Sequence, residues 1–271
     1  MYDARLITSP TMSGKITIRV DERIGWIIFD HEARRNAITS EMWRTIPRAV
    51  ADLESNPEVR VVVLRGAGET AFVSGADISE FEDNRRGAAA EEYDRDNARA
   101  FEALLSLSKP SIAMIHGFCV GGGCALALTA DLRYAADDGV FGIPAARLGL
   151  GYTAGGLEML VRVVGLPAAR EIFFTARRFD APNALRLRLV NEVVPKAELE
   201  AHVRKIADEI ASNAPLTLRS AKLVLSEMAK PSEARDRAAV AASIRACYDS
   251  ADYNEGVRAF LEKRRPRFTG K

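Results

Sequence analysis

The sequence predicts an α/β fold in which strands and helices alternate, followed by an all-helical C-terminal region. Residues 60–65 and 111–116 are short runs that are apolar on both faces, which is typical of parallel strands covered by helices. Segments of helical periodicity separate these runs, so we expect helical crossovers between the strands. After Pro195 only helical periodicity remains. The chain is therefore divided into an N-terminal extension (1–14), an α/β core (15–195) and a helical region (196–271).

The composition favours a globular protein that acts on a small molecule. Of 271 residues, 48% are hydrophobic, which is enough to bury a sizeable core. Because 38 Lys and Arg residues balance 37 Asp and Glu residues, no global charge attracts the chain to nucleic acid or to a membrane surface. No apolar run approaches the roughly 18 residues that a membrane-spanning helix needs. We therefore expect a small-molecule partner, with neither nucleic acid nor a membrane.

The cysteines and the N-terminal residues indicate the compartment. Cys119, Cys124 and Cys247 are odd in number and form no CxxC pair, which is typical of reduced thiols in a cytoplasmic protein and predicts no metal site. Residues 1–14 are polar and contain no apolar segment of the signal-peptide kind, so we expect a frayed extension.

The elements of the core follow from the periodicity. Residues 15–20 and 26–30 flank a polar turn, which predicts a β-hairpin. Residues 39–54 have one apolar face and predict a helix that tolerates Pro47 with a kink. Further along, we expect a helix over residues 97–108, a buried helix over 124–130 and a strand over 132–135.

The C-terminal region begins with an amphipathic helix. Its apolar stripe consists of Leu199, Val203, Ile206 and Ile210. Further helices are expected over residues 216–228, 232–248 and 251–264. Such helices have little core of their own, so they must pack on the α/β core, on another subunit or on both.

Two glycine-containing segments carry the functional signal. Residues 73–77 (VSGAD) and 120–124 (VGGGC) each lie where an apolar strand gives way to a helix. The first N–H groups of a helix have no partner within it, and they favour negative charge. Glycine allows an oxygen atom to come close to the main chain. The sequence therefore predicts a site that holds an oxyanion.

These segments also resemble a known family. Residues 71–77 (AFVSGAD), 116–123 (HGFCVGGG) and 141–144 (FGIP) resemble the enoyl-CoA hydratase/isomerase family, the crotonase superfamily. The resemblance extends from about residue 15 to residue 268. It implies a crotonase-like spiral of ββα units with an all-helical oligomerisation region, assembled as a homotrimer or hexamer. It also implies an acyl-CoA substrate of fatty acid metabolism, with coenzyme A as part of the substrate and no permanently bound cofactor.

The resemblance implies roles for particular residues. The backbone N–H groups of Ala76 and Gly122 would form the oxyanion hole for the thioester enolate. Coenzyme A would be contacted by residues beside the hole and by residues of a neighbouring subunit. The first group is Arg34, Arg35, Ser74 and Ala76, and the second is Phe260 and Lys263. A solvated turn explains the arginines equally simply, and a helix end that attracts cations explains Lys263.

The chain departs from the family at the groups that move protons. Hydratases of the family carry glutamate at the positions of Ala125 and Ala145, and isomerases usually keep an acid at the second position. An alanine side chain can neither activate water nor deliver a proton. Since acid–base catalysis contributes roughly 10²- to 10⁴-fold per group, the loss of both predicts hydration slower by about 10⁴- to 10⁸-fold.

Two other residues are candidates for the missing chemistry. Residues 148–152 (LGLGY) and 248–253 (YDSADY) resemble methylmalonyl-CoA decarboxylase, in which a tyrosine stands at the position of Tyr152. That enzyme has a histidine where this chain has Ala76, and a tyrosine that lines an apolar acyl pocket is the simpler explanation. Glu158 is the second candidate, although an acid in the first turn of a helix is expected on dipole grounds.

Three functional hypotheses stay open at this point. The first is a hydratase- or isomerase-like enzyme that uses the hole with non-standard acid–base groups. The second is a decarboxylase-like lyase that uses Tyr152 as proton donor, because loss of CO₂ produces the enolate directly. The third is an acyl-CoA-binding protein without catalysis.

Overall fold

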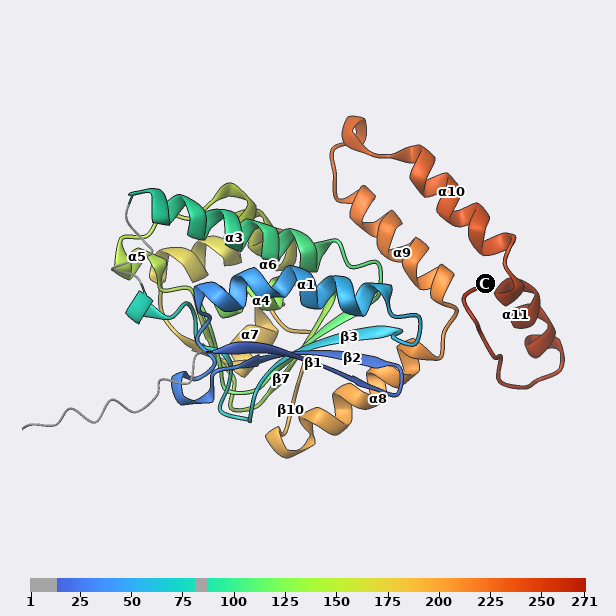
Figure 1. Cartoon of the computed structure of the whole chain (residues 1–271), viewed down its shortest axis with the longest axis horizontal. Coiled ribbons are helices and arrows are strands. Elements are labelled where there is room, and N and C mark those ends of the chain that lie inside the picture. The colour runs from blue at the N-terminus through green and yellow to red at the C-terminus, as the bar shows by residue number, and fades with distance from the viewer. Residues whose placement is uncertain (1–13, 81–86) are drawn as a thin grey trace, which may run out of the picture.

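The computed structural model describes residues 14–80 and 87–271, and its centre is a six-stranded sheet (Figure 1). The strand order is β1 (Lys15–Asp21), β2 (Ile24–Asp30), β3 (Val61–Gly66), β5 (Ser111–Ile115), β7 (Leu132–Ala136) and β10 (Glu192–Val194). β1 and β2 form an antiparallel hairpin, whereas all the other neighbours are parallel. The predicted α/β class, the parallel pairing and the N-terminal hairpin are therefore confirmed. Apart from Gly14, the predicted N-terminal extension lies outside the described residues.

A second, four-stranded sheet carries the loops of interest. Its order is β4 (Ala71–Val73), β6 (Phe118–Val120), β8 (Val140–Gly142) and β9 (Phe179–Asp180). The first three strands are parallel to one another, and β9 is antiparallel to β8. The sequence did not separate these short strands from their neighbours, because each has only two or three residues.

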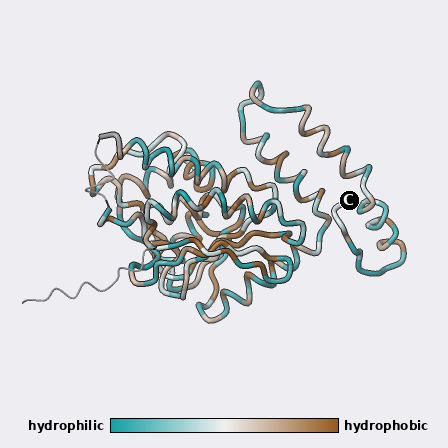
Figure 2. Tube along the Cα trace, viewed as in Figure 1, coloured by the Kyte–Doolittle hydropathy of each residue, from teal (hydrophilic) through white to brown (hydrophobic). Residues whose placement is uncertain are grey.

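The larger sheet is buried on both faces, as its apolar strands predict. Val62 and Leu64 face one cluster of buried side chains, and Val61 and Val63 face another. Figure 2 shows the hydrophobic strands at the centre of the molecule. The first cluster lies under helices α1 (Ser40–Ser55), α3 (Gly87–Leu105), α4 (Gly122–Thr129) and α6 (Ala154–Thr175). The second lies under α8 (Leu199–Ala211).

Two short α-helices and three single-turn 3₁₀ helices complete this part of the chain. They are α5 (Ala145–Leu148), α7 (Ala181–Arg186) and the single-turn 3₁₀ helices η1 (Glu32–Arg34), η2 (Ile78–Glu80) and η3 (Lys196–Glu198). The helix expected over residues 97–108 begins ten residues earlier, at Gly87. Its first turns are strongly charged on the outside and bury Tyr93 and Asp96, so their apolar stripe is too thin to detect by periodicity.

Helix α1 contains Pro47 in its interior, and hydrogen bonds with side chains hold both of its ends. At the start, Thr39 Oγ1 accepts a hydrogen bond from the Met42 N–H. At the end, the buried ammonium group of Lys109 donates to the carbonyl oxygens of Leu53 and Asn56, both at 2.7 Å. The helix predicted over residues 39–54 is thus confirmed.

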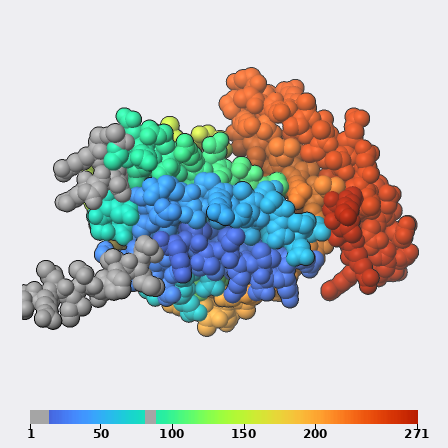
Figure 3. All heavy atoms as spheres, in the orientation of Figure 1, coloured from blue at the N-terminus to red at the C-terminus, as the bar shows by residue number. Residues whose placement is uncertain are grey.

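The C-terminal helices divide into two groups. α8 packs on the sheet through the predicted stripe, with Leu199 and Val203 fully buried. α9 (Pro215–Met228), η4 (Ser232–Ala234), α10 (Arg237–Tyr248) and α11 (Ala251–Leu261) extend away from the sheet. They form a separate lobe in Figure 3. The helix expected over residues 232–248 is interrupted between η4 and α10. The division of the chain at residue 195 stays a prediction.

The lobe has an exposed apolar groove of about 860 Å³ along α9, α10 and α11. Leu225, Phe260 and Leu261 are 66%, 82% and 74% exposed. A surface of this kind is typical of a protein–protein contact. Within residues 14–80 and 87–271, no helix is long and apolar enough to cross a membrane.

Candidate active site

The two predicted loops meet because their strands are neighbours. β4 and β6 are adjacent and parallel, with Val73 paired to Cys119, so both chains leave the sheet at the same edge. The first loop then forms a bridge with the chain before α1. The Ile38 N–H donates to the Gly75 oxygen, and the Asp77 N–H donates to the Ile38 oxygen, both at 2.8 Å. Since N–H directions alternate along an extended chain, the Ala76 N–H points to the opposite side.

That side faces the start of α4. A Cβ atom on Gly122 would lie 3.8 Å from the Ala76 amide nitrogen, so the two main-chain segments are in contact distance. Gly122 is the first residue of α4, and its N–H has no acceptor within the helix. Among the hydrogen bonds of the described residues, neither this N–H nor that of Ala76 has an acceptor. Two adjacent donors without acceptors form a site suited to an oxygen anion.

The steric need for glycine falls on the residues that flank Gly122. Gly121 has a φ of +54°, which L side chains rarely adopt. A Cβ on Gly123 would lie 2.0 Å from the Val73 oxygen, so only glycine lets α4 pack this closely on β4. At Gly122 itself, a Cβ would meet only ordinary van der Waals contacts.

Asn36 connects the segments around the first loop, and the sequence analysis missed it. This residue is fully buried, and its amide group donates to the oxygens of Ala67 at 2.9 Å and Ala71 at 2.8 Å. Its own oxygen accepts from the His31 N–H at 3.0 Å. Its φ of +56° is a conformation that asparagine tolerates better than most residues. In the sequence Asn36 is a single polar residue between Arg35 and Ala37, and no pattern indicates its structural role.

Asp77 fixes the peptide that follows Ala76. Its carboxylate accepts hydrogen bonds from the N–H and the hydroxyl of Ser79, at 3.0 and 2.7 Å. Burial alone raises the pKa of Asp77, but the Ser79 hydrogen bonds and the nearby charges of Arg34 and His31 outweigh it. The net effect lowers the pKa of Asp77 below its usual value. The ionised carboxylate is therefore part of the loop structure.

The two alanines that the sequence analysis singled out are buried. Ala125 lies one turn after Gly122 on the same face of α4 and is 8% exposed. Ala145 is the first residue of α5 and is 3% exposed. Trp43 of α1 also lies against Gly122, a contact that the sequence did not reveal. His116 is buried as well, and burial is the main cause that lowers its pKa.

Tyr152 and Glu158 lie near the start of α6. The Tyr152 ring packs edge-on against Phe173, with 5.1 Å between ring centroids, and belongs to the border of the core. Its position opposite the hole stays a prediction. The Glu158 carboxylate is 2.7 Å from the Arg162 guanidinium, and both side chains are more than half exposed. This arrangement is that of a surface ion pair.

The residues predicted to contact coenzyme A fall into two distant groups. Ser74 contacts both arginines, because its N–H donates to the Arg35 oxygen and its hydroxyl to the Arg34 oxygen, each at 3.1 Å. The Arg35 guanidinium lies 4.6 Å from the centre of the Phe118 ring. Phe260 and Lys263 are exposed at the end of α11, at the opposite end of the molecule (Figure 1). Within one chain they do not reach the hole.

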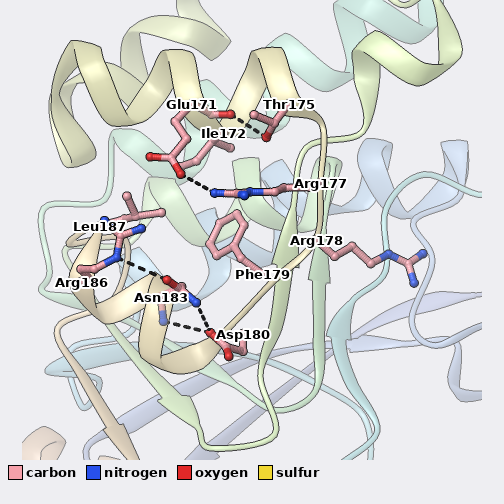
Figure 4. A pocket seen from close by; sticks show the side chains of 10 residues that line it. All are labelled: Glu171, Ile172, Thr175, Arg177, Arg178, Phe179, Asp180, Asn183, Arg186 and Leu187. Atoms are coloured by element: carbon pink, nitrogen blue, oxygen red, sulfur yellow. Dashed lines mark hydrogen bonds and ion pairs between the residues drawn. The ribbon is translucent and has the colours of Figure 1, made fainter.

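A hollow of about 380 Å³ lies between the end of α6 and α7 (Figure 4). Its charged side chains contact one another: Arg177 pairs with Glu171 at 2.5 Å, and Asn183 donates to Asp180. Arg178 points away from the hollow and lies 5.8 Å from the Phe118 ring centre. The hollow therefore offers no acid or base to the hole. No group of three or more potential metal ligands occurs in the part of the chain that the structure describes.

Comparisons with known proteins identify one family of similar chains. The sequence profile of the enoyl-CoA hydratase/isomerase family matches residues 19–271. A crotonyl-CoA hydratase of Syntrophomonas wolfei is 34% identical over 94% of this chain and 98% of its own. A peroxisomal Δ(3,5)-Δ(2,4)-dienoyl-CoA isomerase of Arabidopsis thaliana is also 34% identical, over 92% and 93%. The crystal structure of an enoyl-CoA hydratase/isomerase family protein from Hyphomonas neptunium superimposes with a TM-score of 0.90 at 35% identity, covering 96% of this chain and 100% of that one.

The lowered pKa of Asp77 predicts acid sensitivity of the loop. Its carboxylate stabilises the fold above the unfolded value of about 4, and this contribution is lost as the pH falls through the lower folded value. We expect the free energy of unfolding to fall more steeply between about pH 5 and pH 2 in the wild type than in Asp77→Asn. Urea denaturation at several pH values measures both slopes. Asp208→Asn, at an exposed position of α8, is the control and should keep the wild-type slope. If the free energy of unfolding of Asp77→Asn fell as steeply with pH as that of the wild type, the assignment would be contradicted.

Proposed function

Because the chain belongs to the enoyl-CoA hydratase/isomerase family, we propose that it binds an acyl-CoA thioester and stabilises its enolate form with the N–H groups of Ala76 and Gly122. The observation that carries this proposal is the contact between two main-chain donors that lack acceptors. As an enolate forms, negative charge moves to the thioester oxygen. Donors fixed in advance around that oxygen stabilise the charge without having to reorganise.

The same loop offers a surface for coenzyme A. Arg34 and Arg35 are exposed beside Ser74, two residues before Ala76. Their guanidinium groups suit phosphate oxygens. We place the phosphates of coenzyme A on this side of the hole and the acyl group on the buried side. The molecule is part of the substrate in this proposal.

We propose that Phe260 and Lys263 act in an assembly of several subunits. Since both are far from the hole of their own chain, they serve a neighbouring subunit's substrate. The exposed apolar groove of α9, α10 and α11 supports such an assembly, because the described chain leaves it uncovered. A homotrimer or hexamer fits the family, and we propose a cytoplasmic location.

The reaction differs from standard hydration in this proposal. The buried methyl groups of Ala125 and Ala145 neither activate water nor deliver a proton. The names of the relatives do not select a reaction, because one is a hydratase and another an isomerase. The first candidate is an enzyme of the hydratase or isomerase type that uses non-standard acid–base groups. Decarboxylation with Tyr152 as proton donor is the second candidate, because it needs fewer proton transfers, and binding without catalysis is the third.

A panel of CoA thioesters followed by mass spectrometry separates these candidates. Hydration adds water, isomerisation leaves the mass unchanged but alters the chromatographic retention, and decarboxylation of a malonyl-type thioester removes CO₂. Binding without any product would favour the third candidate. If the Tyr152 hydroxyl donates the proton, Tyr152→Phe should slow decarboxylation by about 100-fold or more, because the hydroxyl acts only in the transition state.

The hole is tested by a matched pair of substitutions. Gly122→Pro removes one donor at the first position of a helix, where proline is well tolerated. We expect turnover to fall by about 10²- to 10³-fold, as for loss of one oxyanion-hole donor. Gly122→Ala keeps the N–H and has room for its methyl group, so it should retain most of the activity. If Gly122→Pro and Gly122→Ala both fold and are equally active, the oxyanion is held elsewhere.

The rate of crotonyl-CoA hydration tests whether Ala125 and Ala145 prevent standard hydratase activity. We expect a rate at least about 10⁴-fold below that of a competent hydratase, because two acid–base groups are missing. Loss of the enoyl absorbance measures this rate, with the Syntrophomonas wolfei relative as reference. A turnover comparable with the reference would show that other groups of this chain activate water.

A further inference from the structure

Trp43 is the side chain that lies nearest to the Cβ position of Gly122. Its Cζ2 atom would lie 3.6 Å from a Cβ on Gly122, and the Ala76 nitrogen would lie 3.8 Å from the same point. The indole edge is thus within van der Waals distance of the Cβ position of Gly122, the residue that carries one of the two donors. Trp43 is only 2% exposed and belongs to the main buried cluster of the core.

Trp43 is held from α3 in a fixed orientation. Its indole N–H donates to the Tyr93 hydroxyl oxygen at 3.0 Å, and both groups are buried. Its ring packs edge-on against Phe101, with 5.3 Å between ring centroids. Moving the indole would break a buried hydrogen bond and an aromatic contact together. The ring therefore behaves as a rigid wall.

The direction of the substrate follows from the two sides of the loop. Arg34, Arg35 and Ser74 lie on the solvent side, whereas Trp43 and Tyr93 lie on the buried side. A thioester whose oxygen occupies the hole, with coenzyme A toward solvent, directs the far end of its acyl group at the indole. The length of the acyl group is then limited by the distance to this ring.

We propose that Trp43, oriented by Tyr93, is the residue that restricts this chain to short acyl groups. The inference rests on the proposed function, since it needs an acyl-CoA with its thioester oxygen at Ala76 and Gly122. The closeness of Trp43 to the Gly122 position and its buried hydrogen bond to Tyr93 carry it. An open apolar pocket would behave in the opposite way, because each further buried methylene improves binding by about fourfold.

The affinities of acetyl-, butyryl-, hexanoyl- and octanoyl-CoA, measured by calorimetry, test the proposal. We expect butyryl-CoA to bind at least about tenfold more tightly than octanoyl-CoA, because the longer chain has to displace packed rings. A steady gain of about fourfold per methylene through octanoyl-CoA would overturn the inference while leaving the proposed function intact. If neither these thioesters nor coenzyme A itself binds, the proposed function fails.

Two substitutions of the same kind assign the effect to Trp43. Trp43→Leu opens the wall and should shift the preference to the longer thioesters. Trp26→Leu is the matched control, because Trp26 is equally buried but lies in the cluster on the opposite face of the sheet, under α8. It should keep the wild-type preference. An unchanged preference in folded Trp43→Leu would overturn the assignment.

Fluorescence provides a test that does not require Trp43→Leu to fold. The chain has two tryptophans, so Trp26→Phe leaves Trp43 as the single emitter. Saturation with butyryl-CoA should change the Trp43 emission, whereas coenzyme A without an acyl group should change it much less. Equal changes with the two ligands would show that the acyl group does not reach the indole.

Discussion

The site depends on one constraint: two backbone N–H groups are exposed, side by side, at the point where two short parallel strands end. An N–H group without an acceptor is costly inside a protein, so such pairs occur where a ligand completes them. The closeness of Ala76 and Gly122 requires α4 to sit directly on β4, and the absence of a side chain at Gly123 makes this possible. Asn36 and Asp77 then hold the first loop in place through hydrogen bonds that are buried at Asn36 and partly buried at Asp77.

In the proposed function, charge stabilisation and proton transfer belong to different parts of the site. In this proposal, the hole stabilises charge on the thioester oxygen whatever step produces it, because it acts on the enolate and not on the leaving group. Proton transfer depends on side chains around it, and two of these positions are alanine in this chain. The fold can therefore keep a common electrostatic function while the reaction changes with a few side chains.

The sequence predicted the parts of the structure that depend on local patterns. Apolar runs such as residues 61–64 indicated buried parallel strands, and two glycine-containing segments indicated the two loops that meet beside α4. The start of α3 was missed because its outer face is charged. Trp43 and Tyr93 are 50 residues apart, and no pattern in either helix indicates that the two side chains meet. The positions of Tyr152 and of the α11 residues relative to the hole depend on substrate and on assembly, which a single sequence does not contain.

The most direct test of the account is the infrared carbonyl frequency of a bound thioester. A non-reactive butyryl-CoA labelled with ¹³C at the carbonyl reports on its own oxygen, free of the protein background. Donation by Ala76 and Gly122 weakens the C=O bond, so the band should appear at a lower frequency than in water and shift part of the way back in Gly122→Pro. A bound band at or above the frequency in water, unchanged in Gly122→Pro, would contradict the central claim that these two N–H groups hold the thioester oxygen.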